Sequence, residues 1–358
     1  MPSIDTTNWL GPVNNARKAD GTRGDYSKQL FADIFRDNVM NQYSNACIIK
    51  DTHKILPGGK GSETQTVFLS SEAGAGIDIK TTGGGTGDIL FGTINKNKVP
   101  INLDPDYDSN LALAHDELDQ VVNDARERVD VARKVANAVA REWDFWLHVK
   151  LLQGALAKAR VTRMDNGSMV DIKAASKAQV TAEELKEAVF ALKAMYEDKN
   201  VVQYLNWLLM SPTDYSKLAQ LSVLLDVDLG GSGSISKGNV KEIAGFLLKK
   251  SNVMPTANYT ATTKIETLPF AYANDGREEE LIGHLKNNYV VDGTDLIALS
   301  YDRNSVATVL WRPMTVKTPK HSDIDIIKKK WYISCFQRSG SEYMMEATCG
   351  GIRRIATD

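Results

Sequence analysis

Hydrophobic residues recur at intervals of three and four positions near the start of the chain. After Tyr26, the positions that follow this spacing are Leu30, Phe31, Ile34, Phe35 and Val39. The spacing predicts an amphipathic helix of about four to five turns, which Asp25 can cap at its start. Residues 1–25 mix glycine, proline, asparagine and charge without periodicity, which predicts an extended arm. Such an arm has no core of its own, and we expect it to lie on a neighbour.

Short strand-like pieces and turn-rich stretches alternate between residues 51 and 108. Residues 64–69 and 77–80 have the composition of strands, and the chain returns through residues 89–99. The intervening stretch contains Gly74, Gly76, Gly83, Gly84, Gly85 and Gly87. This pattern predicts a long, exposed β-hairpin. A lone hairpin is marginal in water and glycines weaken it further, so we expect a neighbouring subunit to support it.

The longest helical pattern runs from about Leu113 to Lys158 and contains one glycine, Gly154, near its end. Its narrow apolar stripe is rich in alanine and valine: Leu118, Val121, Val122, Ala125, Val129, Ala132, Val135, Ala136, Val139, Trp143 and Trp146. At ~1.5 Å per residue an unbroken helix would span roughly 65–70 Å. Because leucine is scarce on the stripe, a helix lying along a sheet is favoured over a coiled coil.

Helix and strand patterns alternate after this segment. Residues 160–180 are predicted as a loop, and Thr181 with Glu184 forms a capping box that begins a helix. A second helix is predicted from residue 214, and residues 228–239 read as an exposed loop. Strands are predicted at residues 207–210, 246–249, 297–301, 307–310, 314–317, 324–336 and 343–351. The order predicts an α+β chain that contains an α/β domain.

Composition narrows the class of protein. Hydrophobic residues make up 42% and charged residues 25% of the 358 residues, which is ordinary globular usage. The net charge of −2 excludes a strongly basic nucleic-acid coat. The sequence has no run of ~18 apolar residues and no apolar signal core, so we expect no membrane span and synthesis in the cytosol. Three cysteines are too few for a disulfide framework.

No motif in the sequence predicts catalysis, a cofactor or a metal. Residues 57–62 lack the spacing of a phosphate-binding loop, and Gly74 and Gly76 open no dinucleotide-binding helix. The five histidines lack metal-ligand spacing. Residues 328–330 are lysines followed by two aromatic residues, which suits single-stranded nucleic acid but more commonly forms a solvated strand edge. A soluble α/β enzyme remains a remote alternative, because catalytic residues need not cluster in sequence.

Four segments, in this order, carry a family resemblance. The first is KQLFADIFRDNVMNQYSNACIIKD, and the second is INLDPDYDSNLALAHDELDQVVNDARERVDVARKVANAVAREWDFWLHVKLL. The third combines LLMSPTDYSKL with KEIAGFLLKKSNVMP, and the fourth combines ALSYDRNSVATVLWRPMTVKT with ATCGGIRR. Together they resemble the major capsid proteins of tailed phages, which have the Hong Kong 97-like fold, and within that class the short-tailed-phage type.

The resemblance implies a division of the chain into parts. Residues 1–50 would form the N-terminal arm and helix, and residues 51–108 the extended β-hairpin called the E-loop. A peripheral domain with a long spine helix would comprise residues 109–173 and 315–340. An axial α/β domain would comprise residues 174–314 and 341–358. The E-loop and arm would each cross a neighbouring subunit.

The resemblance also implies a function and partners. Copies of the chain would form the hexamers and pentamers of an icosahedral phage shell around double-stranded DNA, which they would contact non-specifically. A portal protein would occupy one vertex. Only about 25 residues precede the first helix, so we expect a separate scaffolding protein. Assembly would take place in the host cytoplasm, and the product would be the virion. The shell of a cellular encapsulin-like nanocompartment is the alternative with the same fold.

Candidate residues for contacts between subunits come from the arm helix, the hairpin and the long helix. They are Phe31, Phe35, Gly74, Ile77, Ile79, Gly84, Ile89, Phe91 and Trp143. The hypothesis behind them is that these segments bury too little surface within one subunit and complete their burial on copies of the same chain.

Overall fold

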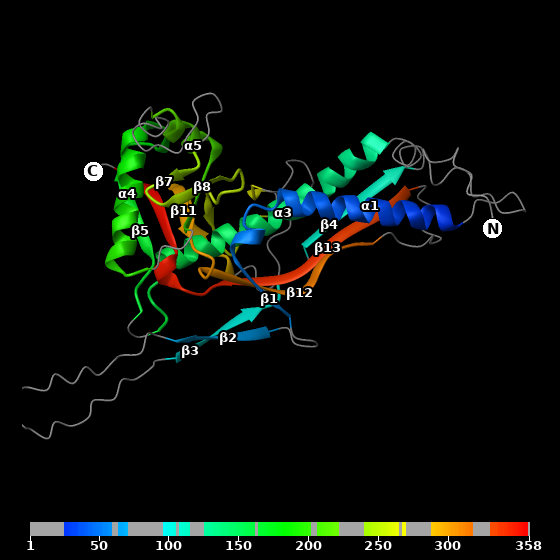
Figure 1. Ribbon diagram of the computed structural model, residues 1–358, viewed down its shortest axis with the longest axis horizontal. Helices are drawn as coiled ribbons and strands as arrows, with labels where there is room; N and C mark the ends of the chain where they lie inside the picture. Colours follow the sequence, from blue (N-terminus) through cyan, green and yellow to red (C-terminus); the bar gives the residue numbers. More distant parts are fainter. Residues whose placement is uncertain are drawn as a thin grey trace, which may run out of the picture.

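The computed structural model describes eleven stretches of the chain (Figure 1). They are residues 25–58, 64–70, 96–104, 107–114, 125–161, 164–201, 206–221, 240–264, 267–269, 288–317 and 330–356. The helices are α1 (Asp25–Ala46), α3 (Ala125–Leu156), α4 (Ala182–Asp198) and α5 (Pro212–Ala219). Short 3₁₀ helices are η2 (Lys50–Thr52), η3 (Lys177–Gln179) and η6 (Glu346–Thr348). Within these stretches the chain is a mixed α+β protein.

The described strands form two main sheets and two small ones. The four-stranded sheet has the order β1 (Lys54–Pro57), β12 (Val306–Lys317), β13 (Lys330–Tyr343), β4 (Tyr107–Ala114). The six-stranded sheet has the order β5 (Ser168–Lys173), β14 (Gly350–Ile355), β11 (Leu296–Tyr301), β6 (Asn206–Met210), β8 (Phe246–Lys250), β7 (Glu242–Ile243). The small sheets pair β2 (Thr64–Ser70) with β3 (Lys96–Asn102) and β9 (Asn258–Tyr259) with β10 (Val291–Asp292).

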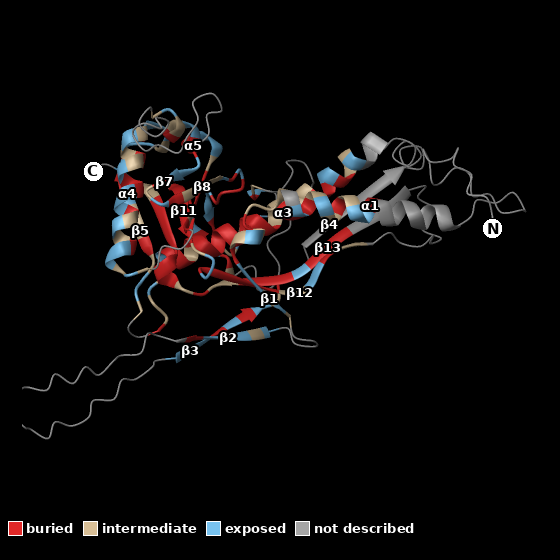
Figure 2. Cartoon of the chain, in the orientation of Figure 1, coloured by how far each residue is buried: buried red, intermediate tan, exposed pale blue. Residues whose placement is uncertain are grey.

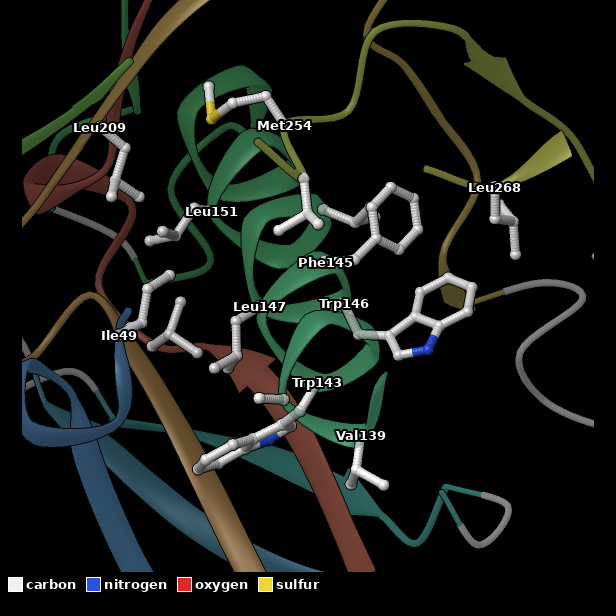
Figure 3. Close-up of a cluster of buried hydrophobic side chains, with 14 of the residues drawn as sticks. Ile49, Val139, Trp143, Phe145, Trp146, Leu147, Leu151, Leu209, Met254 and Leu268 are labelled. Atoms are coloured by element: carbon white, nitrogen blue, oxygen red, sulfur yellow. The ribbon is translucent and has the colours of Figure 1, made fainter. Parts of the chain in front are cut away.

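Helix α3 joins the two main sheets. Its first described half lies with α1 along the four-stranded sheet, and its second half enters the interior (Figure 1). Residues 143–150 are buried on every side of the helix, as the continuous buried colour in Figure 2 shows. This part of α3 lies in the interior of the subunit, and its polar residues Asp144, His148 and Lys150 are buried together with the apolar ones. Figure 3 shows Trp143, Phe145 and Trp146 pointing from successive sides of α3 into the core.

Helix α1 packs on α3 with a face of its own. Phe35, Val39 and Tyr43 are buried at the spacing that the sequence predicts. The rings of Tyr43 and Trp143 stack with centroids 6.1 Å apart, and the Tyr43 hydroxyl donates a hydrogen bond to Gln337 of β13. The helix is confirmed, and its 22 residues exceed the predicted length.

The compact region around the six-stranded sheet has the predicted α/β character. The Thr181 side chain accepts the Glu184 N–H at 3.3 Å, and the Glu184 carboxylate accepts the Thr181 N–H at 2.8 Å. This capping box begins α4, whose buried face includes Leu185, Val189 and Leu192. The strands predicted at 207–210 and 246–249 are confirmed as β6 and β8, which pair in parallel.

Three sequence predictions are wrong in part. Leu113 lies in β4, where it pairs with Trp331, so it does not begin the long helix. The predicted loop at 160–180 contains β5, which pairs in parallel with β14. The predicted strand at 343–351 contains η6 between β13 and β14. In each case a long-range strand pairing or a local turn overrode the short-range pattern.

Candidate assembly site

The ribbon formed by β2 and β3 has two different faces. Along β3 the side chains of Val99 and Ile101 are 2% and 0% exposed, whereas the intervening Pro100 is exposed. The buried face packs on a cluster of apolar residues from β12 and the segments after α3 and β13: Val161, Ala307, Val309 and Met344. Because successive side chains of a strand point to opposite faces, the second face points away from the subunit.

Phe68 is the most prominent residue on that outward face. It is 65% exposed, the highest value among the large hydrophobic residues of the described stretches. Its partner across the ribbon is Lys98, whose Nζ lies 5.6 Å from the centroid of the ring. An exposed cation–π contact of this kind contributes only ~0.5–1 kcal/mol and leaves most of the ring in water. Aromatic side chains are enriched in the surfaces through which proteins contact one another, so the exposed Phe68 ring marks a candidate contact surface.

The ribbon is held at a fixed place on the subunit. Asn102, at the end of β3, crosses Gly340 of β13 so closely that a Cβ at position 340 would overlap the Asn102 carbonyl oxygen. Only glycine permits this approach of two backbones. At the other end of β3 the Asn97 side-chain amide donates to the Arg160 carbonyl at 2.9 Å. These contacts fix the direction in which the outward face points.

A buried polar junction fixes the chain between α1 and β1. Asp144 of α3 is buried and accepts the backbone N–H groups of Ile48 and Ile49 at 2.8 and 3.3 Å. Lys249 of β8 donates to the Ile48 carbonyl at 2.8 Å and to the Thr52 hydroxyl at 3.1 Å. The segment that leads from the arm helix toward the ribbon is therefore bonded to the long helix and to the six-stranded sheet at once.

Burial perturbs the titratable groups at this junction. The pKa of Asp144 is raised to about 7 because burial disfavours the carboxylate more than its two N–H bonds favour it. The pKa of Lys249 is lowered, again because of burial. His53 hydrogen-bonds through its ring nitrogens to the Ile49 carbonyl and the Thr308 hydroxyl, each at 2.9 Å, and burial lowers its pKa to about 4. A neutral His53 at neutral pH fits this dry environment.

A second polar network lies where the end of α3 meets β13. The Glu342 carboxylate accepts from Lys150 at 2.8 Å and from Arg160 at 2.6 Å. Arg160 also lies 3.3 Å from the Glu346 carboxylate and covers the Tyr343 ring at 3.5 Å. Removing one member would leave buried charge without its counter-ion, so we interpret the network as a structural tie between α3, β13 and η6.

Two hollows flank Glu342. One of about 510 Å³ is bordered by Leu156 and Val290, each 44% exposed, and the other of about 270 Å³ is bordered by Lys98 and Arg160. Both are shallow and mixed in polarity. Within the described stretches no three His, Cys, Asp or Glu residues are grouped to hold a metal, and no described helix is long and apolar enough to cross a membrane.

The structure describes only part of the predicted contact set. Phe35 and Trp143 are 0% and 1% exposed in the subunit's own core, so neither side chain has surface to offer a neighbour. The expectation that the arm helix has little core of its own is therefore wrong for its described residues. The Phe31 side chain lies outside the described part of α1. The remaining candidates also lie outside the described residues: Gly74, Ile77, Ile79, Gly84, Ile89 and Phe91.

The sequence analysis did not single out Phe68 or Asp144, which the structure places on the outward face of the ribbon and at the buried junction. Phe68 lies within the predicted strand, and the alternation of its neighbours was the signal that it could face outward. Asp144 stands between Trp143 and Phe145 in the apolar part of the helix, and a carboxylate in such surroundings signals a buried polar partner. That partner, the backbone at Ile48, is 96 residues away in sequence, so no local pattern could identify it.

Comparison with known proteins bears directly on this architecture. A family model described as Gp10A-like, major capsid protein, matches residues 123–320, more than half of the chain. The chain belongs to this major capsid protein family. It is a phage major capsid protein. Proteins of this kind are structural components of the virion. Comparison with curated protein sequences gives no match.

Solved structures show the same fold. The capsid of cyanophage P-SCSP1u aligns with a TM-score of 0.68 and 20% identity over 87% of this chain and 89% of the other. The mature capsid of bacteriophage PhiM1 aligns with a TM-score of 0.60 and 14% identity over 86% and 87% of the two chains. The predicted Hong Kong 97-like α+β fold is thus confirmed.

Proposed function

We propose that copies of this capsid protein form the hexamers and pentamers of an icosahedral phage head that encloses double-stranded DNA. The observation that supports this is the two-faced ribbon of β2 and β3. One face is anchored on its own subunit through Val99 and Ile101, and the other presents Phe68 to solvent. A subunit with this asymmetry completes its burial only on another copy.

We expect the stability of the shell to come from the sum of many small contacts between subunits. Burying a phenylalanine contributes about 1.5–3 kcal/mol, which does not hold two subunits together against the loss of translational freedom. In a shell each subunit both gives and receives such contacts, so small contributions add around every subunit. The predicted contacts at Gly74, Ile77, Ile79, Gly84, Ile89 and Phe91 belong to the same proposal, since residues 71–95 connect the ends of β2 and β3.

The domain division is also part of the proposal. Residues 109–173 and 315–340 would form the peripheral domain, and residues 174–314 and 341–358 the axial domain. The four-stranded sheet under α3 and the six-stranded sheet beside α4 support two such units. Because β5 pairs with β14 and β12 pairs with β13, the boundaries at residues 173 and 314 fit the two sheets better if they are moved to residues 167 and 305.

We assign this chain a structural role and no catalytic one. We propose that a separate scaffolding protein guides assembly in the host cytoplasm, that a portal protein occupies one vertex, and that contacts with DNA are non-specific. The net charge of −2 supports the last point, because a near-neutral container does not grip each phosphate.

Deletion of residues 74–87 tests the proposed role of the hairpin. The variant should remain a folded subunit in size-exclusion chromatography and circular dichroism, and should give no closed particles in negative-stain electron microscopy under conditions, with the assembly partners present, in which the unaltered protein forms them. A second variant replaces the same residues with a Gly-Ser sequence of equal length and should also fail, because Ile77 and Ile79 are lost. Normal particles from either variant would contradict the role given to this segment.

A further inference from the structure

The chain that leads from α3 into β5 contains the one Asn-Gly pair of the sequence, Asn166–Gly167. This pair forms a turn that lies against the end of α3. The backbone N–H of Gly167 donates to the Ala157 carbonyl at 3.0 Å, and the Asn166 side-chain oxygen accepts the Ala159 N–H at 2.8 Å. The turn thus supplies partners for backbone groups that have left the helix and would otherwise lack them.

Two separate contacts demand these two residue types. A Cβ at position 167 would lie 2.3 Å from the carbonyl oxygens of both Gly154 and Ala155, so the approach to α3 requires glycine. The short amide side chain of Asn166 reaches a nearby backbone N–H, which is a habit of asparagine in turns. The fold therefore places side by side two residues whose combination is chemically labile.

The lability comes from an attack of the main chain on the side chain. The backbone nitrogen of Gly167 attacks the side-chain amide carbon of Asn166, a carbon–nitrogen bond closes a cyclic imide, and ammonia leaves with the proton of the N–H. Water then opens the imide at either carbonyl and yields aspartate or isoaspartate at position 166. Glycine favours the attack because no side chain shields its nitrogen.

Lys199, the residue that follows α4, holds the turn in place. Its ammonium group donates to the carbonyls of Asn166 and Gly167 at 2.8 and 3.1 Å and to the Ser168 hydroxyl at 2.7 Å. Ser168 is buried, and its N–H donates to the Cys349 carbonyl at 3.0 Å. The main chain is therefore fixed on both sides of the bond that the reaction would alter.

The attack needs contacts that the folded subunit does not release. The Gly167 nitrogen must give up its bond to Ala157, and the Asn166 side chain must turn from Ala159 toward that nitrogen. Both movements require the turn to leave the end of α3, which is a local opening of the structure.

We propose that Asn166 is a deamidation site gated by the fold, protected while α3, β5 and Lys199 hold the turn and reactive once the turn opens. Isoaspartate adds one carbon to the main chain between positions 166 and 167. The Gly167 N–H and the acceptors of Lys199 then no longer return to their places together. A subunit that reacts while open loses the contact between the end of α3 and the six-stranded sheet.

A series of guanidinium chloride concentrations tests the gate on the full-length, unassembled protein at mildly alkaline pH. Peptide mass spectrometry measures the rate at which Asn166 becomes aspartate or isoaspartate. The rate should be at least tenfold lower in the folded subunit than in the unfolded chain, and it should rise as the subunit opens. Equal rates in the folded and the unfolded protein would overturn the proposal.

A variant tests the part given to Lys199. Lys199→Met removes the three hydrogen bonds, so deamidation of the folded subunit should be about threefold faster or more, with the rate in the unfolded chain unchanged. The matched control is Lys193→Met on the same helix, where Lys193 pairs with Glu197, and its rate should equal that of the unaltered protein. A Lys199→Met subunit that is folded by circular dichroism and reacts at the rate of the control would overturn the role of Lys199. The denaturant series uses the unaltered chain, so it decides on the gate even where Lys199→Met does not fold.

Discussion

The carboxylate of Asp144, in the middle of the buried part of α3, lies 2.8 Å from the backbone nitrogen of Ile48, at the exit of the arm helix. The Lys249 side chain donates a hydrogen bond to the carbonyl of the same Ile48. Both backbone polar groups of this linker residue are therefore hydrogen-bonded to other elements of the subunit. The linker leads to β1 and then to the ribbon. The direction of the outward-facing ribbon is therefore coupled to the core through a few buried polar contacts.

Replacing Asp144 by asparagine should destabilise the unassembled subunit. The amide keeps one acceptor oxygen but replaces the other with an N–H₂ group, so one of the two backbone N–H groups at Ile48 and Ile49 loses its acceptor, and we expect a loss of about 1–3 kcal/mol of unfolding free energy. Urea unfolding followed by tryptophan fluorescence measures it. The matched control is Asp130→Asn on the exposed part of α3, where Asp130 pairs with Arg133 and Lys134, and no measurable change is expected. Equal effects of both variants would contradict the role of the junction.

The stability of the subunit should depend on pH through three buried groups. The pKa of Asp144 is raised to about 7, so its contribution is fully present below the ordinary aspartate pKa and is lost as pH rises through 7. The pKa of both His53 and His148 is lowered to about 4 by burial, so their contributions are present above pH 6.5 and are lost as pH falls. Two histidines outweigh one aspartate, and stability should rise between about pH 4.5 and 6.5.

Asp144→Asn should make that rise steeper. It removes an opposing group, which is worth up to ~1.4 kcal/mol per pH unit for one proton. Urea unfolding at half-unit steps of pH gives both curves. A shallower rise in the variant than in the unaltered protein would show that Asp144 does not hold its proton in the folded subunit.

Phe35→Ala should impair folding as well as assembly. The side chain is fully buried between α1 and α3, and removing a buried phenylalanine costs about 3–5 kcal/mol. Phe35→Leu is the matched control, because it keeps most of the buried volume and should retain most of the stability. Thermal unfolding of the unassembled subunit distinguishes them. An alanine variant as stable as the unaltered protein would mean that the arm helix is held by contacts other than those on α3.

Gly340→Ala should weaken the attachment of the ribbon. The added Cβ overlaps the Asn102 carbonyl oxygen, so the ribbon must shift away from β13. We expect faster proteolysis within residues 64–102 of the free subunit and at least a tenfold loss of particles. Unchanged proteolysis with normal particles would show that this close approach of the two backbones is not required.

The sequence predicted the parts of this fold that depend on local pattern. The capping box at Thr181, the faces of α1 and the strands β6 and β8 follow from residues close together in the chain. β5 escaped prediction because its partner β14 is about 180 residues away. The junction at Asp144 could not be predicted for the same reason, because its backbone partner at Ile48 is 96 residues away. The outward orientation of Phe68 could be assigned only once the structure showed that the opposite face of the ribbon is buried.

Phe68 should matter for assembly and not for folding. Phe68→Ala removes an exposed ring whose only described contact is the one with Lys98, so unfolding of the subunit should be unchanged. Particle yield should fall at least tenfold. The matched control is Phe190→Ala on α4, where the ring is 51% exposed on a different surface, and its particle yield should stay closer to that of the unaltered protein.

The central claim is that the outward face of the ribbon is buried only by another copy of the chain. Thiol labelling of a Thr66→Cys variant tests it most directly, because Thr66 is exposed on the same face as Phe68 and the change leaves Phe68 in place. The three natural cysteines give a low background, since burial raises the pKa of the Cys47, Cys335 and Cys349 thiols well above the ordinary value, and Cys47 is the one of them that is only partly buried. We predict rapid labelling in the free subunit and at least tenfold slower labelling in particles. Equal labelling rates in subunits and particles would contradict the account.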